Sequence, residues 1–292
     1  MNAETIGKAI GLHRTGRTWT GACPACGYKS GFTVEEFKGK VLVCCHAGGC
    51  TQVDVIESLR RLGLWQGEAD TEWTPPPRRQ TAEEKKPDMG AFARDLWHRT
   101  VPAEGTPVES YLRGRGITFP VPPTLRYLPS CKHTGTRLML PAMVAAVSVA
   151  PDREVVAIHR TFLRLDGRGK APVTPDKMTL GPKHGGAVRL APAGPVLIVG
   201  EGIESTLSAM QAAGLPGWSA LSAGGIRSLI LPPLPLAAEV IIAADNDANG
   251  VGQGAAQAAA ARWVAEGRRV RIAMPPTAGV DFNDLIREAA HV

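Results

Sequence analysis

Two segments within residues 195–250 decide the fold. The first reads PVLIVGEGIESTLSAMQAAG over residues 195–214, and the second reads EVIIAADNDANG over residues 239–250. Each contains a short apolar run, at 196–199 and at 240–244, that is typical of a buried strand. Apolar side chains then recur at helical spacing in the first segment, and an alanine-rich stretch follows the second. The sequence therefore predicts a strand and then a helix in both places.

Acidic side chains follow both predicted strands. Glu201 comes directly after the first strand, and Asp245 and Asp247 follow the second. Open α/β sheets bind ligands beyond the carboxyl ends of their strands, so two parallel strands lying side by side would bring these carboxylates together. Carboxylates share a small site at low cost only when a cation neutralises them, and hard oxygen ligands suit Mg²⁺ or Mn²⁺. We expect all three to be catalytic and to bind this metal.

This arrangement resembles the Toprim domain of primases, type IA and II topoisomerases and OLD-type nucleases, which has a glutamate after its first strand and a D-x-D after its third. The resemblance also rests on EGIES at 201–205, SAGG at 222–225 and DFNDLI at 281–286, and it covers roughly residue 195 to the C-terminus. It implies an α/β fold with a Rossmann-like parallel sheet and helices on both faces. It also offers Asp281 or Asp284 as a further metal ligand. The alternative is that these carboxylates are helix N-caps and solvated loop residues.

Five of the six cysteines lie near the N-terminus. CPAC at 23–26 and CCHAGGC at 44–50 flank a β-like stretch at 32–43. Two cysteine knuckles separated by a hairpin are the layout of a zinc ribbon. Four thiolates would close a structural zinc site, and the metal would supply folding energy to a segment too short to rely on its core.

The same segment resembles the zinc-binding domain of bacterial and phage primases, in which the second knuckle runs into a helix, here TQVDVIESL at 51–59. The resemblance implies four zinc ligands: Cys23, Cys26, Cys45 and Cys50. Cys44 and His46 are the alternative donors. The chain departs from the family in having Cys26 where a histidine is common, and in a slightly long second knuckle.

Basic side chains gather at the end of a middle segment that spans residues 90–190. This segment has helical patterns near 92–97 and at 107–116, and strand patterns at 138–140, 143–149 and 155–162. Basic residues on glycine-rich loops can hold phosphates, although ordinary solvated loops are the alternative. The residues that we expect to contact nucleotide or DNA are Arg160, Arg164, Lys170 and Lys183.

The middle segment resembles the region ahead of Toprim in phage and plasmid primase-like proteins. The shared motifs are HRT at 159–161, GRGKA at 167–171 and GGAVRL at 185–190. The resemblance implies that template and nucleotide bind in a basin between this segment and the Toprim domain. We expect Cys131 and His133 to be structural, because no partner pair for a second metal site is evident, and His159 to be a core histidine.

The 292 residues suggest several domains, and charge is spread unevenly along them. The formal net charge is +6; residues 190–292 hold 6 basic and 9 acidic residues, and residues 1–189 hold 27 and 18. The basic N-terminal part is suited to binding a polyanion, and the acidic C-terminal part is suited to binding a metal ion. We expect a zinc ribbon at 1–66, a flexible linker at 67–89 containing PPP at 75–77, a basic part of the primase core at 90–190 and Toprim at 191–292.

Several classes of protein are disfavoured. No apolar run is long enough to span a membrane and the N-terminus lacks the apolar core of a signal peptide, so we expect a cytoplasmic protein with no membrane partner. A topoisomerase would need a nucleophilic tyrosine, and none of Tyr28, Tyr111 and Tyr127 lies in a recognisable cleavage domain. The sequence has no P-loop, so it carries neither an OLD-type ATPase nor a helicase motor of its own.

The combination predicts a DNA primase of a phage, plasmid or other mobile element. Such an enzyme binds single-stranded DNA and nucleoside triphosphates and makes short RNA primers by metal-assisted nucleotidyl transfer. Its further partner would be a separate replicative helicase or a mobile-element replication protein. The alternatives are a metal-dependent Toprim nuclease and a non-catalytic DNA-binding module of a replication complex.

Overall fold

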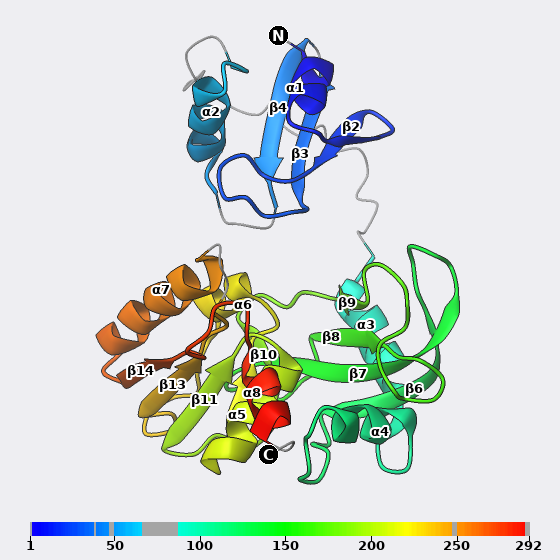
Figure 1. Cartoon of the computed structure of the whole chain (residues 1–292), viewed down its shortest axis with the longest axis vertical. Coiled ribbons are helices and arrows are strands. Elements are labelled where there is room, and N and C mark those ends of the chain that lie inside the picture. The colour runs from blue at the N-terminus through cyan, green and yellow to red at the C-terminus, as the bar shows by residue number, and fades with distance from the viewer. Residues whose placement is uncertain (1, 38, 47–49, 66–86, 247–249, 290–292) are drawn as a thin grey trace. The chain divides into compact units, whose positions relative to one another are not determined.

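The chain divides into two compact units, Met1–Glu84 and Lys85–Val292 (Figure 1). The computed structural model describes residues 2–37, 39–46, 50–65, 87–246 and 250–289. The linker expected at 67–89 lies outside these residues except for its last three positions. Asp247 also lies outside them.

The first unit is a small antiparallel sheet with two helices. Its elements are α1 (Ala3–Ala9), β1 (His13–Thr15), β2 (Thr18–Gly21), β3 (Phe32–Phe37), β4 (Lys40–Cys45) and α2 (Gln52–Arg61). The described strands pair in the order β1-β2-β3-β4. Helix α2 begins where the Thr51 side chain accepts a hydrogen bond from the Asp54 amide and Asp54 accepts one from Thr51, which is a capping box. Phe32 is buried against Ile6 and Leu59 in the core of this unit.

The second unit contains one large mixed sheet, to which ten strands belong among the described residues. Its strands are β5 (Val101–Pro102), β6 (Leu125–Lys132), β7 (Met139–Val149), β8 (Ala157–Phe162), β9 (Lys177–Leu180), β10 (Gly186–Arg189), β11 (Val196–Gly200), β12 (Gly217–Ser219), β13 (Glu239–Ala243) and β14 (Arg269–Ala273). Its helices are α3 (Met89–His98), α4 (Pro107–Gly114), α5 (Ile203–Ala213), α6 (Ala223–Ser228), α7 (Val251–Ala265) and α8 (Phe282–Ala289).

Strand β10 joins the two halves of this sheet. The strand order is β14-β13-β11-β12-β10-β7-β6-β5, with β8 and β9 continuing from β7. Strands β11, β12, β13 and β14 are parallel, whereas β10 is antiparallel to both β12 and β7. The segments expected at 90–190 and 191–292 therefore share one continuous sheet.

Strand β7 differs in detail from the sequence expectation, which placed two strands at 138–140 and 143–149. The structure has one strand there, with Pro141 inside it. Proline has no backbone N–H, but its carbonyl oxygen still accepts, and here it accepts from the Leu163 amide at 2.8 Å. The proline therefore does not end the strand.

Helices cover both faces of the parallel part of the sheet, as expected for Toprim (Figure 1). Alternate residues of β11 point to opposite faces: Ile198 belongs to the core that includes Leu207 of α5, and Val199 belongs to the core that includes Trp263 of α7. Burial on both sides explains why this strand is a continuous apolar run. The sheet is fixed by packing on each face, which gives the carboxyl ends of its strands a rigid position.

Candidate active site and metal centre

Glu201 and Asp245 lie at the same edge of the sheet. Strands β11 and β13 are parallel neighbours, with Gly200 opposite Ala243. Glu201 follows the first strand by one residue and Asp245 follows the second by two, and both are half-buried. The structure thus brings together two of the three carboxylates that the sequence singles out. Asp247 falls in the segment that is not described.

Close packing holds the start of α5 against the end of β11. A Cβ atom added at Gly200 would overlap the Thr206 hydroxyl, so only glycine fits there. The carbonyl oxygen of Glu201 accepts hydrogen bonds from Ser219 Oγ at 2.8 Å and from the Leu221 amide at 2.9 Å. The backbone that carries the Glu201 carboxylate is therefore fixed by the strand, the helix and the loop after β12.

The loop after β13 is anchored through Asn246. Its Nδ2 donates to the Pro275 carbonyl at 2.9 Å, and its Oδ1 accepts from Gln253 Nε2 of α7 at 3.2 Å. Its backbone carbonyl also accepts from the Gly279 amide. Asp245 is thus held between the buried end of a strand and a residue that is hydrogen-bonded both to α7 and to the loop between β14 and α8.

The Asp281 carboxylate caps the N-terminus of α8. Its Oδ1 accepts from the amides of Asn283 and Asp284 at 2.7 and 2.9 Å, which caps α8, and its Oδ2 accepts from Ser205 Oγ at 3.1 Å. Helix-capping was the alternative role for these carboxylates, and Asp281 fulfils it. Its hydrogen bond to Ser205 nevertheless brings it to the first turn of α5, next to the Glu201 segment.

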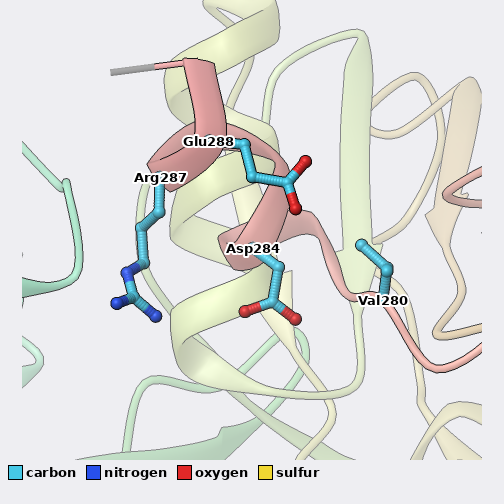
Figure 2. A pocket seen from close by; sticks show the side chains of 4 residues that line it. All are labelled: Val280, Asp284, Arg287 and Glu288. Atoms are coloured by element: carbon cyan, nitrogen blue, oxygen red, sulfur yellow. The ribbon is translucent and has the colours of Figure 1, made fainter. Parts of the chain in front are cut away.

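Asp284 lines an open pocket on α8. The pocket has a volume of about 270 Å³ and is lined by Val280, Asp284, Arg287 and Glu288. Figure 2 shows the last three projecting from the helix, with Val280 in the segment before it. Neither Glu201 nor Asp245 is among the lining residues.

The structure brings one of the four predicted basic residues to the acidic edge. Lys183 Nζ donates to Ser222 Oγ at 3.2 Å. Burial lowers the pKa of Lys183, and the negative charge of Glu201 opposes this shift. Lys183 therefore supplies a partly desolvated cation beside Glu201.

The other three basic residues have different surroundings. Arg160 is 5% exposed and belongs to the buried side of β8 that carries Phe162, with its guanidinium 5.9 Å from the Phe162 ring. Lys170 forms an ion pair with Asp176 at 2.8 Å, and Arg164 forms one with Asp166 at 3.6 Å. Strand alternation turns Arg160 away from the face that carries His159.

A buried carboxylate that the sequence analysis did not single out lies next to the acidic edge. Glu204 in the first turn of α5 accepts from Tyr111 Oη at 2.7 Å and from Lys177 Nζ at 3.1 Å. Burial alone would raise its pKa, but the charge of Lys177, the backbone amide of the helix and the Tyr111 hydroxyl together lower it to about 2. In the sequence, Glu204 is visible only as the second glutamate of EGIES. Glutamate is common in the first turn of any helix, so this position did not stand out.

His159 is buried, with the charges of both lysines acting on its ring. Burial, followed by the charges of Lys177 and Lys183, lowers the pKa of His159 to about 3. Its Nδ1 is 3.0 Å from the Thr179 hydroxyl. The expected core position of His159 agrees with this burial.

The first unit brings four cysteines together. The sulfur atoms of Cys23, Cys26, Cys45 and Cys50 all lie within 4.8 Å of one another. Ser58 of α2 donates to the Pro24 carbonyl at 2.7 Å, which ties the first knuckle to the helix. This is the cluster that the zinc-ribbon resemblance implies.

The alternative zinc donors lie outside this cluster. Cys44 is exposed and its Sγ is 3.7 Å from His46 Nδ1, while His46 Nε2 is 3.1 Å from the Thr33 hydroxyl. Within the cluster, burial raises the pKa values of Cys23 and Cys50, because a buried thiolate without a cation is unfavourable. Four soft sulfur donors in one place fit zinc, which binds thiolates and neutralises them.

Residues 196–291 match the profile of a family described as the Toprim domain, and residues 88–190 match a family described as a domain of unknown function, DUF7146. The Toprim resemblance inferred from the sequence is thereby confirmed. The boundary between the two matches follows β10. No curated protein matches the chain significantly.

Three solved structures illustrate the likeness to primases. A DNA primase domain from Pseudomonas aeruginosa is 16% identical, with a TM-score of 0.44 over 68% of this chain and 74% of that chain. The zinc-binding and RNA polymerase domains of the Aquifex aeolicus primase are 14% identical, with a TM-score of 0.40 over 98% and 79%. The DnaG catalytic core is 18% identical, with a TM-score of 0.43 over 68% and 73%. All three TM-scores are below 0.5, and the match to Toprim is to residues 196–291 alone.

Among the described residues, none of the helices has the length and apolar character needed to cross a bilayer.

Proposed function

We propose that the chain is a DNA primase, which joins ribonucleoside triphosphates into short RNA primers on a single-stranded DNA template. The proposal rests mainly on one observation: Glu201, Asp245 and Lys183 lie at one edge of the sheet. Glu201 and Asp245 are within the residues that match Toprim, and Lys183 precedes them. Carboxylates for a metal and a cation for phosphates are the two requirements of nucleotidyl transfer.

Glu201, Asp245 and Asp247 are the residues that would hold Mg²⁺ or Mn²⁺. The donor set fits a hard cation, because the described members are half-buried carboxylates at neighbouring strand ends. A divalent cation bound there would stabilise charge on the attacking oxygen and on the leaving pyrophosphate. Asp284 and Asp281 are weaker candidates, because Asp281 already caps α8.

In the proposed reaction, the 3′-hydroxyl of the primer attacks the α-phosphorus of the incoming nucleotide, and pyrophosphate leaves. Lys183 would bind the negatively charged phosphates, and its burial strengthens that attraction because water screens it less. Glu201 would either bind the metal or accept the proton that the 3′-hydroxyl loses. Lys177, on the same face as His159, is a second candidate for phosphate contact.

The first unit would serve the template. We propose a structural zinc on Cys23, Cys26, Cys45 and Cys50, which would hold the two knuckles against α2. The basic excess itself lies beyond this unit, because residues 1–84 hold ten basic and ten acidic residues whereas residues 85–189 hold 17 and 8. Electrostatic attraction to single-stranded DNA is therefore expected mainly from residues 85–189. A replicative helicase would be a separate protein.

Primer synthesis on single-stranded DNA with labelled nucleoside triphosphates, across a Mg²⁺ and Mn²⁺ titration, tests the proposal. Short labelled RNA products that depend on template and on Asp245 are the expected result. Nicking or degradation of DNA with Mn²⁺ and no primer would replace the proposal with a Toprim nuclease. Template binding without either activity would indicate a non-catalytic module.

A further inference from the structure

Among the described residues beside the acidic edge, Glu204 has the most enclosed carboxylate, and both of its oxygens accept hydrogen bonds. Oε1 accepts from Tyr111 Oη at 2.7 Å and Oε2 accepts from Lys177 Nζ at 3.1 Å. The three residues come from α4, α5 and β9, which are far apart in the sequence. Burying an ionised carboxylate is costly unless it is paired and hydrogen-bonded, so this site is held together as a unit.

The ion pair is asymmetric. The Glu204 side chain is 7% exposed, whereas that of Lys177 is 31% exposed. Here the carboxylate is fixed inside and the lysine reaches outward, so an ammonium is held in a defined place where a ligand can approach it.

The direction of Lys177 follows from the sheet. On β9, Lys177 is opposite Thr161 and Thr179 is opposite His159, so the side chains of Lys177 and Thr179 share one face. That face carries His159, whose surroundings include both Lys177 and Lys183. Lys183 in turn lies beside Glu201. Lys177 also contacts Glu204, which lies three residues after Glu201 in the first turn of α5, so its ammonium is held near the acidic edge.

Building on the proposed function, we propose that Glu204 is a positioning residue that holds the Lys177 ammonium in place to bind the phosphates of the incoming nucleotide. Glu204 itself touches neither the nucleotide nor the reacting atoms. A free lysine side chain loses rotamer freedom when it binds a ligand, and the ion pair with Glu204 removes that cost beforehand. Its effect should appear in nucleotide binding more than in the chemical step.

Steady-state primer synthesis by the full-length protein tests this inference with four variants. These are Lys177→Ala, Glu204→Gln, the double variant and the control Glu239→Gln. Glu239 is a matched control because it is 15% exposed, is paired with Arg269 at 2.9 Å, and begins β13 at the end opposite to Asp245. Thermal melting of each variant checks the fold.

We expect Lys177→Ala to raise the KM for nucleotide on the order of tenfold, as loss of one charge-assisted hydrogen bond implies. Glu204→Gln should raise KM several-fold with a smaller change in kcat, and Glu239→Gln should match wild type. The deciding measurement is the double variant, whose KM should equal that of Lys177→Ala alone because Glu204 acts through the lysine.

The inference would be overturned if the rise in KM of the double variant equals the product of the rises in the two single variants. Such a result would show that Glu204 does not act through Lys177. A Glu204→Gln protein with unchanged KM, or with a loss confined to kcat, would also overturn it. If Glu204→Gln does not fold, an unchanged KM in Lys177→Ala overturns it equally. Wild-type protein that makes no primer would refute the proposed function, and this inference with it. When the wild type is active, the variants test the role of Glu204 alone.

Discussion

The substitution Cys45→Ser should remove zinc from the first unit and unfold it, whereas Cys44→Ser should leave both unchanged. The two cysteines are neighbours in sequence, but strand alternation sends their side chains to opposite faces of β4. Cys45 belongs to the sulfur cluster, whereas Cys44 is exposed beside His46. Comparison of the two variants therefore distinguishes the effect of losing a proposed zinc ligand from the effect of losing a cysteine outside the cluster.

The size of the effect follows from the small core. A unit of this length rarely obtains more than about 3–5 kcal/mol of stability from its hydrophobic core. Structural zinc contributes roughly 10–16 kcal/mol in comparable small domains, so one of four thiolates accounts for on the order of 3–4 kcal/mol. Cys45→Ser should therefore remove about as much stability as the core supplies, and the unit should lose zinc and unfold. Cys44→Ser should keep both zinc and fold.

Zinc content by elemental analysis and limited proteolysis measure the two outcomes. In Cys45→Ser, protease should degrade residues 1–65 and leave a resistant fragment that contains the second unit, since that unit has its own cores. Wild type and Cys44→Ser should retain one zinc per chain. Loss of zinc from Cys44→Ser, or full retention by Cys45→Ser, would refute the assignment of ligands, and zinc-free folded wild type would refute the metal itself.

Three other predictions concern the second unit and DNA binding. Asp245→Ala should abolish primer synthesis without lowering the melting temperature, because it removes one charge from a group of like charges; primer yield at the wild-type rate would contradict this metal site. Binding of single-stranded DNA should weaken steeply between about 50 and 200 mM salt, and an affinity independent of salt in a filter-binding titration would contradict an electrostatic contact. Tyr111→Phe should cost roughly 1–3 kcal/mol, because it removes one donor from the buried Glu204 carboxylate, as denaturant melts would measure.

The pH dependence of that last variant has a definite sign. The pKa of Glu204 is lowered from 4.5 to about 2 in the folded protein. Its ionised form therefore contributes stability above pH 4.5, and that contribution is lost as the pH falls towards 2. Without the Tyr111 donor the folded-state pKa rises, so the contribution is smaller and its loss is complete at a higher pH. Melts that show the same acid limb for both proteins would contradict this role of Tyr111.

Local pattern was sufficient where one segment carries the whole signal. The apolar run at 196–199 and the helical spacing after it correspond to β11 and α5, and the run at 240–244 corresponds to β13. The cysteine spacing likewise anticipated the cluster. Burial on both faces makes such strands uniformly apolar, and metal ligands need fixed residue types, so both leave a clear record in the sequence.

Pairings between distant segments left no such record. Tyr111 and Glu204 are 93 positions apart, and neither residue type is unusual for its helix. Arg160 was grouped with the phosphate-binding residues by its charge, but which way it points depends on the pairing of β8 with β7 and β9. A pattern of residue types indicates that a strand is present, whereas the face that each side chain occupies is set by register, which only the assembled sheet determines.

The position of β10 has a consequence for dissecting the protein. A truncation at residue 190 would look natural, because the two family matches are separated there. It would nevertheless separate β10 from β12, and so leave β12 of the C-terminal fragment at a sheet edge with unpaired N–H and C=O groups. Such edges recruit strands from other chains, so an isolated Toprim fragment should self-associate on purification. Expression of the catalytic part should therefore begin near residue 85, where the chain itself changes from one compact unit to the next.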